Sequence, residues 1–370
     1  TQVRQQFIAE AVIVSLGALV LSFVLFLVLR PQFIGMAPEM QKLVKLELTP
    51  MMVVLFIAFA ILVGIMAGVV PAVFFSKVSI INALRNSSSV KVFKNLSLRR
   101  SLVVIQYTFT LVFITATTIG YEQYKSILAF DLGYSTANVF NIRLQGNKPE
   151  TLIKELEEIP EITSISKSMM ITSVGNYWGG HMKYKNSQDS ALVWYNVVDE
   201  NYFPLHGHKL IAGGNFIARP KAKDEATEVI VNQQVLKRFN IAQDDPAQAI
   251  GEELTVDQRK LRIVGVLQDF HYGKVESKIE PVLFTIWTGK DDGFLNLKIE
   301  SKDIIATRAK IDIAWKDIDK IHPIEGAFYT DAIEDAYSEF SAMIKVIGFL
   351  SFLAISIASM GLFGMVVFTT

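Results

Sequence analysis

The sequence predicts a membrane protein in which four transmembrane helices form a bundle that carries an extracytoplasmic α+β domain. Four runs, residues 11–29, 51–75, 102–120 and 346–368, contain no charged residue and no histidine. Each run is long enough, at 1.5 Å per helical residue, to cross a hydrocarbon core of about 30 Å. Hydrophobic residues make up 51% of the chain, mean hydropathy is +0.34, and the charges are spread unevenly. Buried helices of a soluble protein are the alternative, but these normally keep a polar stripe, which the four runs lack.

The loop between the second and third runs predicts the orientation. Residues 76–100 contain basic residues and no acid, whereas residues 30–49 carry both signs. The basic residues are Lys77, Arg85, Lys91, Lys94, Arg99 and Arg100. The positive-inside rule places this loop in the cytoplasm. Its basic residues could also bind anionic lipid headgroups, but their role in fixing the topology is enough to explain them. Residues 31–49 and 122–340 then lie outside, and both ends of the chain lie inside. The expected divisions are residues 1–121, 122–340 and 341–370.

The second run carries a glycine pair and a proline near its end. Gly64 and Gly68 fall on one helical face, where the backbone of a partner helix can approach closely. Pro71 lacks a backbone N–H, so we expect it to kink or end the helix at the inner surface. Glycine is also common in membrane helices, so spacing alone does not decide its role.

The outer segment alternates between strand and helix patterns. Two strand–helix–strand units are expected at residues 139–144, 149–159 and 162–168, and at residues 294–299, 305–318 and 326–329. They predict an α/β part near residues 135–172 and 293–331, with a β-rich insertion at 173–292. Residues 121–130 and 332–346 have helical patterns and are expected to continue the third and fourth membrane helices as stalks.

No group of residues in the sequence predicts catalysis, a cofactor or a metal. The chain has no cysteine, which excludes thiolate ligands and nucleophiles. His181, His206, His208 and His271 lack the spacing of a zinc site and are interpreted as ordinary loop histidines. Asp269 next to Phe270 and His271 is interpreted as a turn after a strand. The formal net charge of +0 does not favour nucleic acid, and no ATP-binding motif is present.

Several stretches together resemble the MacB/FtsX-like family of ABC transporter permeases, in particular the long type with two permease halves. They are "GIMAGVVPAVFFSKVSIINALRN", "LRRSLVVIQYTFTLVFI", "VVDENYFPLHGHKLIAGGNF", "LRIVGVLQDFHYGKVESKIEPVLF" and "MGLFGMVVFTT". Gly214 departs from the family, which often has arginine after Ala-Gly. The resemblance implies a cytoplasmic ATPase partner, a second permease half or subunit, and transmission of motion across the membrane. It also implies coupling segments before Gln5 and after Thr370, so that Gln2, Val3 and Arg4 are the remnant of the first and the chain is an internal fragment.

The sequence therefore predicts a non-enzymatic permease subunit in the bacterial inner membrane, with its large domain in the periplasm, where a periplasmic partner is a candidate. Within the same family, the alternative is an FtsX-like regulator of a periplasmic cell-wall hydrolase. From another class, a membrane-anchored sensor that binds a ligand outside would have the same organisation. A co-purifying ATPase would distinguish a permease from a sensor.

Overall fold

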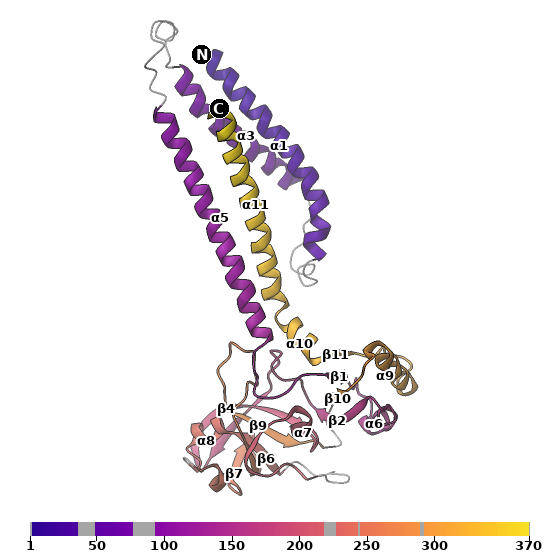
Figure 1. Ribbon diagram of the computed structural model, residues 1–370. Coiled ribbons are helices and arrows are strands. Elements are labelled where there is room, and N and C mark those ends of the chain that lie inside the picture. The colour runs from indigo at the N-terminus through magenta and orange to yellow at the C-terminus, as the bar shows by residue number, and fades with distance from the viewer. Residues whose placement is uncertain are drawn as a thin grey trace. The chain divides into compact units, whose positions relative to one another are not determined.

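The computed structural model describes residues 2–35, 49–76, 93–217, 227–242, 245–288 and 292–369 (Figure 1). It divides into two compact units. The helical unit comprises Thr1–Tyr124 and Ser338–Thr370, and the α+β unit comprises Lys125–Tyr337. The boundaries fall after Tyr124 and after Tyr337, where the sequence predicts 121/122 and 340/341.

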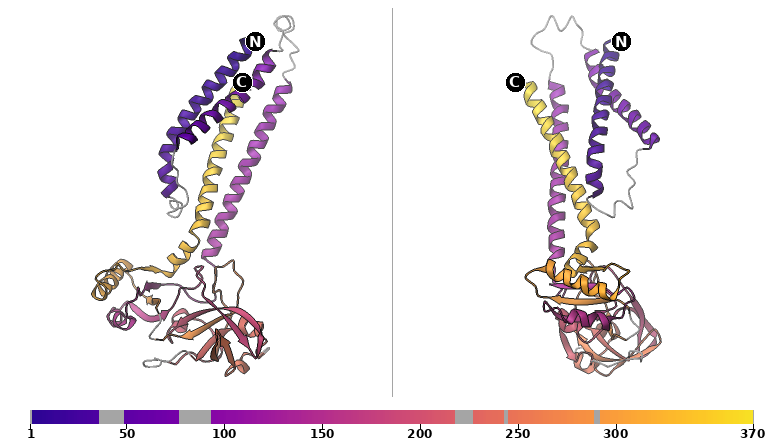
Figure 2. Two further views of the ribbon diagram at one scale, coloured as in Figure 1. Left: turned by 180° about the vertical axis from the view of Figure 1, so that it is seen from behind. Right: turned by 90° about the vertical axis from the view of Figure 1, so that its right-hand side faces the viewer.

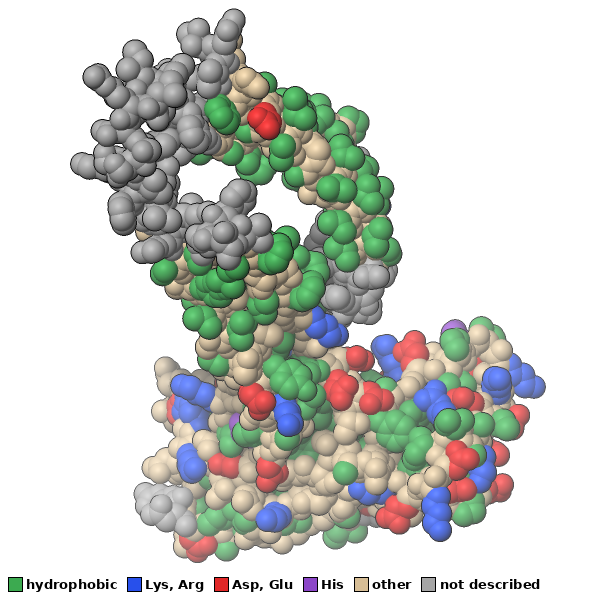
Figure 3. Space-filling view, turned by 45° about the horizontal axis from the view of Figure 1, so that its top comes forward, with side chains coloured by type: hydrophobic (Ala, Val, Ile, Leu, Met, Phe, Trp, Pro, Cys, Tyr) green, Lys and Arg blue, Asp and Glu red, His purple; other side chains and the backbone are tan. Residues whose placement is uncertain are grey.

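The helical unit contains four long helices among the described residues (Figure 2). They are α1 (Gln2–Gly35), α3 (Pro50–Ser76), α5 (Phe93–Leu128) and α11 (Ser338–Thr369). Each contains a stretch long and apolar enough to cross a membrane. Large apolar side chains such as Ile13, Phe59, Phe109 and Phe363 are exposed on them, and Figure 3 shows hydrophobic side chains over this unit and charged ones over the α+β unit. Lipid is the solvent that such surfaces require.

The helices extend further than the uncharged runs, which corrects two expectations. α3 does not end at Pro71 but continues to Ser76. A proline removes one backbone donor and leaves the rest of the hydrogen-bond ladder, so a membrane helix tolerates it. α5 begins at Phe93, so Lys94, Arg99 and Arg100 belong to a helix and not to a loop. Lys77, Arg85 and Lys91 lie outside the described residues. Gln2, Val3 and Arg4 form the first turn of α1.

In the α+β unit, the described residues form one sheet of eleven strands. The strands are β1 (Val139–Arg143), β2 (Ile162–Ser168), β3 (Gly179–Tyr184), β4 (Asn186–Val198), β5 (Leu210–Gly213), β6 (Glu228–Asn232), β7 (Glu253–Val256), β8 (Arg259–Leu267), β9 (Val282–Ile286), β10 (Phe294–Ile299) and β11 (Gly326–Phe328). Their order is β11-β1-β10-β2-β4-β3-β7-β8-β6-β9, with β5 paired to β8 and β4 paired also to β9. Only the β4–β9 and β6–β8 pairs are parallel among the described strands.

Helices complete the hydrophobic cores of this unit. They are α6 (Pro149–Glu157), α7 (Tyr202–His206), α8 (Gln233–Phe239), the 3₁₀ helix η1 (Pro246–Ala249), α9 (Ile304–Ile318) and α10 (Tyr329–Ala336). α6 and α9 bury Leu152, Leu156, Ile311 and Trp315 in one core with residues of β1 and β10. α6 is short and has proline at its start, where the missing N–H costs nothing, and its apolar residues recur at helical spacing.

The sequence did not predict β3, β5 or α7, and the expectation of one continuous helix over residues 332–346 was wrong. Tyr337 separates α10 from α11, so the fourth long helix begins only at Ser338. β3 begins with Gly179 and Gly180, which lack the side chains of a strand pattern. A Cβ at Gly179 would approach the Trp194 ring to 2.9 Å, so the strand pairing itself requires glycine there.

Candidate functional site

The two segments that join the α+β unit to long helices meet in a buried polar cluster, which we call the tyrosine joint. Tyr134 lies in the segment after α5, and Tyr329 is the first residue of α10. Their hydroxyl oxygens are 3.0 Å apart although 195 positions separate them in the sequence. Thr172 and Ser173, in the loop between β2 and β3, complete the joint.

Each polar group of the tyrosine joint has a partner. The Tyr134 hydroxyl lies 2.8 Å from Thr172 Oγ1 and 2.7 Å from Ser173 Oγ. Tyr329 donates to the Thr172 carbonyl over 2.9 Å, and Ser173 Oγ donates to the His271 carbonyl over 2.5 Å. Burial raises the pKa of both tyrosines, so both remain neutral donors. A buried network with all its members paired fixes the relative positions of the segments it joins.

Two of the histidines pack around this joint, which corrects their interpretation as ordinary loop residues. His206 is fully buried at the end of α7, and its Nδ1 lies 2.9 Å from the Ser135 carbonyl. The His208 ring stacks on Tyr134 with 4.7 Å between ring centroids. Burial lowers the pKa of His206 to about 4 and that of His208 well below its usual value, so both rings are neutral. No three metal-ligating side chains come together among the described residues.

A second set of contacts fixes the point where the chain leaves the α+β unit. The Lys274 ammonium donates to the Ala336 carbonyl at the end of α10 over 2.6 Å and lies 5.1 Å from the centre of the Tyr337 ring. The Tyr337 hydroxyl accepts from the Val275 N–H over 2.8 Å and donates to Glu276 over 2.9 Å. These contacts hold Tyr337 outside helical geometry, which explains the break before α11.

The remaining polar residues singled out in the sequence have structural roles. Asp269 accepts hydrogen bonds from the Gln234 backbone N–H over 3.1 Å and from its side-chain amide over 2.6 Å. Its position holds the start of α8 against the segment after β8. Gly213 has a φ of 71°, and a Cβ there would overlap the Val264 carbonyl, so this turn requires glycine.

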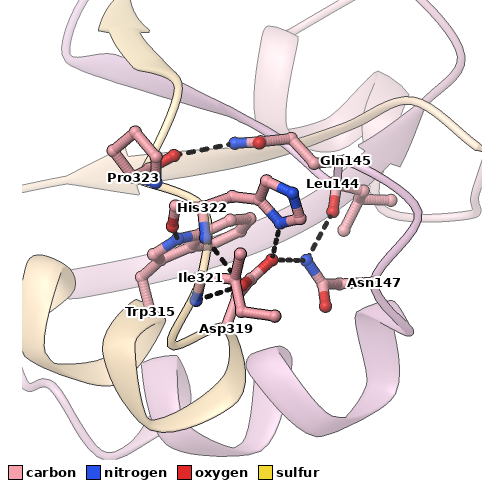
Figure 4. A network of polar contacts seen from close by, with 8 residues as sticks. All are labelled: Leu144, Gln145, Asn147, Trp315, Asp319, Ile321, His322 and Pro323. Carbon is pink, nitrogen blue, oxygen red and sulfur yellow. Dashed lines mark hydrogen bonds and ion pairs between the residues drawn. The ribbon is translucent and has the colours of Figure 1, made fainter.

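The two strand–helix segments on either side of the β-rich region are tied together at Asp319 (Figure 4). The carboxylate accepts from the backbone N–H groups of Ile321 and His322, each over 2.9 Å, and from the Asn147 amide over 3.0 Å. These hydrogen bonds, with one from the His322 ring, hold the pKa of Asp319 well below its usual range. Asn147 precedes α6 and Asp319 follows α9, so the contact fixes one helix relative to the other.

In the helical unit, the glycine face of α3 contacts α1 of the same chain. A Cβ at Gly64 would lie 2.7 Å from the Val12 Cα, and a Cβ at Gly68 would lie 2.9 Å from the Ile8 Cα. Ser15 Oγ on α1 donates to the Ala60 carbonyl on α3 over 2.8 Å. This is close approach of two backbones through small residues, with a polar contact added.

α5 and α11 also contact each other. Thr117 Oγ1 and Ser351 Oγ are 2.8 Å apart, so one hydroxyl donates to the other, and the accepting hydroxyl can donate to a carbonyl of its own helix. Gly348 and Gly361 lie on the α11 face toward α5, next to Thr117 and Gln106. Hydroxyl pairs of this kind link neighbouring membrane helices by a weak polar contact.

Comparisons with known proteins identify the family. Residues 58–310 match the MacB-like periplasmic core domain, and this match covers more than half of the chain. The chain belongs to this family, and is therefore a permease-type membrane protein of ABC transporters with an extracytoplasmic domain and a cytoplasmic ATPase partner. A comparison with curated proteins gives no match.

Two solved structures are similar to part of the chain. The periplasmic region of MacB from Actinobacillus actinomycetemcomitans has 15% sequence identity and a TM-score of 0.41, over 54% of this chain and 92% of that chain. The extracellular domain of the noncanonic ABC-type transporter YknZ from Gram-positive bacteria has 12% identity and a TM-score of 0.38, over 51% of this chain and 100% of that chain.

Proposed function

We propose that this chain is the permease subunit of an ABC transporter of the bacterial inner membrane and transmits ATP-driven motion from a cytoplasmic ATPase to its periplasmic domain. The export or extrusion of envelope substrates is the proposed outcome, and the protein performs no reaction of its own. The working unit includes a second permease half or subunit.

The tyrosine joint is the observation that carries this proposal. A lever must be stiff where force is applied, or the motion is lost as local deformation. Tyr134 and Tyr329 connect the first and last segments of the α+β unit through hydrogen bonds of 2.7–3.0 Å that water does not reach. A movement of α5 or α11 would therefore act on one rigid point of the domain.

The contact between α5 and α11 supports the same mechanism. It consists of single hydroxyl and glycine contacts, which allow one helix to shift relative to the other at low cost. Membrane hydrogen bonds of this type contribute only about 0.6 kcal/mol on average. ATP binding, which supplies several kcal/mol, would therefore suffice to change their register.

The first experiment asks whether an ATPase encoded beside the protein co-purifies with it and whether this protein changes the ATPase rate. We expect both results. A membrane protein that neither binds nor stimulates such an ATPase, and changes conformation on binding an external ligand instead, would be a sensor, and the proposal would be wrong.

The second experiment immobilises the α5–α11 contact. Because the chain has no cysteine, T117C/S351C introduces one defined disulfide between side chains whose oxygens are now 2.8 Å apart. We expect oxidation to uncouple ATP hydrolysis from movement of the outer domain and reduction to restore it. The control is Thr118→Cys with S351C, because Thr118 is exposed and directed to another side of α5. Full coupling in the oxidised T117C/S351C protein would exclude relative motion of these helices.

A further inference from the structure

Exposed aromatic side chains lie along the edge of the α+β unit that carries both connections to membrane helices. Phe130 is 41% exposed, Tyr177 37% and Trp178 54%. Phe130 packs edge-on against His271, with 4.9 Å between ring centroids. The Tyr177 hydroxyl accepts from the Lys274 N–H over 3.3 Å, and Lys274 in turn binds the last turn of α10. The segment from His271 to Lys274 thus runs between the two connections with aromatic residues on both sides.

These aromatic residues are held rigidly, unlike the side chains of a mobile loop tip. Tyr177 packs on Trp194 with 4.9 Å between ring centroids, and the Trp178 indole N–H donates to the Tyr195 hydroxyl. A Cβ at Gly273 would overlap the Tyr177 hydroxyl, so the loop is shaped around this ring. A platform that keeps large aromatic surfaces exposed at a fixed position loses little conformational entropy when it binds.

Chain connectivity limits how far this edge can be from the lipid. The span within α5 extends to Leu128, and the span within α11 begins at Ser338. The uncharged runs are shorter, since they stop at Gly120 and start at Val346. If only these runs lie in the hydrocarbon core, about eight further helical residues, or about 12 Å, separate the core from each connection. With the longer spans, the two connections leave the helices at the boundary of the hydrocarbon core, where the headgroup layer, roughly 5–8 Å deep, begins.

We propose that this edge of the α+β unit rests in the lipid headgroup layer, with Trp178, Tyr177 and Phe130 as interfacial anchors. Tryptophan and tyrosine favour the membrane interface because their rings are apolar and their tips form hydrogen bonds. Lys274 and Glu276 lie beside them, and this mixed charge suits zwitterionic headgroups. The anchor would set the resting position of the domain. The inference requires only that α5 and α11 cross a membrane, and it stands whether or not the chain serves a transporter.

The test uses the absence of cysteine to place one fluorescent probe at a time on the full chain in phospholipid nanodiscs. Asn176→Cys places the probe next to the intact aromatic residues, and Ile305→Cys, on α9 at 84% exposure, is the matched control. We expect spin labels on the lipid headgroups to quench the probe at position 176 strongly and the probe at 305 weakly. Spin labels deep in the acyl chains should quench neither.

A second variant separates anchoring from simple proximity. W178A/Y177A in the Asn176→Cys background, measured below the unfolding temperature of the variant, should reduce headgroup quenching and increase quenching by iodide in the water. Equal headgroup quenching at positions 176 and 305, or no change on removal of the two aromatic rings, would overturn the proposal. Quenching that is lost only when a periplasmic protein or a saccharide is added would indicate a different occupant and would also overturn it.

Discussion

Removal of the Tyr134 hydroxyl tests whether the tyrosine joint holds the α+β unit together. Tyr134→Phe keeps the ring and deletes an oxygen within 3.0 Å of Thr172, Ser173 and Tyr329. Each partner keeps another hydrogen bond: Ser173 to the His271 carbonyl, Tyr329 to the Thr172 carbonyl, and Thr172 Oγ1 to Tyr329. No buried donor is left without a partner. The free energy of unfolding should therefore fall by the contribution of one or two well-formed hydrogen bonds, about 1–2 kcal/mol.

The chain offers a selective assay for this change. All four tryptophans, Trp178, Trp194, Trp287 and Trp315, lie in the α+β unit, so their fluorescence reports its unfolding in urea and not that of the helices. We expect the Y134F transition to move to lower urea with an unchanged slope. Tyr177→Phe, which deletes an exposed hydroxyl, is the control and should change the free energy of unfolding by less than about 0.5 kcal/mol.

A double-mutant cycle with Tyr329→Phe isolates the contact between the two tyrosines. Tyr329→Phe leaves the buried Thr172 carbonyl without its donor and should cost about 2 kcal/mol. Because the two hydroxyls share partners, the double variant should cost about 1 kcal/mol less than the sum of the single variants. Strict additivity, or a Y134F protein as stable as Y177F, would refute the idea that the joint acts as one network.

Two further predictions concern the buried histidine and the glycine face. His206, with a pKa of about 4 when folded against about 6.5 when unfolded, should lower the stability of the α+β unit as pH falls from 6.5 to 4, by about 3 kcal/mol. Since burial raises the pKa of Asp199 to about 7, which acts in the opposite direction over this range, the quantity to measure is the stability difference between wild type and His206→Phe. A difference that does not vary with pH would contradict the burial of His206. Gly68→Leu should weaken the α1–α3 pairing by about 1–3 kcal/mol, because the new side chain would meet backbone atoms of α1. Gly17→Leu, with open space around it, should be tolerated; equal thermal stability of the two variants in detergent would disprove the close approach.

The sequence predicts the four long helices well, because an uncharged apolar run of this length can hardly form anything other than a membrane-spanning helix. It also predicts the strand at β1, where Val139, Phe140 and Ile142 leave a clear signal. The expectation that α3 ends at Pro71 was wrong, because it applied a rule for soluble helices to a membrane helix, which can continue past a proline.

The tyrosine joint could not be predicted. Tyr134 and Tyr329 are 195 positions apart, and no local pattern distinguishes them from other tyrosines. The burial of His206 and His208 was missed for a related reason, since their partners come from the segment after α5 and from α10. The one local indication in the sequence is the stretch "YFPLHGH", in which the histidines follow several large apolar residues. Tyr202, Phe203 and Leu205 in this stretch are all buried.

The most direct test of the whole account is a map of which side of the membrane each segment occupies. Single cysteines at Ser190 in β4 and at Lys91 in the basic segment can be labelled in intact cells with a reagent that does not cross the inner membrane. We expect Ser190→Cys to react from the periplasm and Lys91→Cys to react only after the cells are lysed. Labelling of both positions from the same side would contradict four membrane crossings and, with them, any transmission of motion to an outer domain.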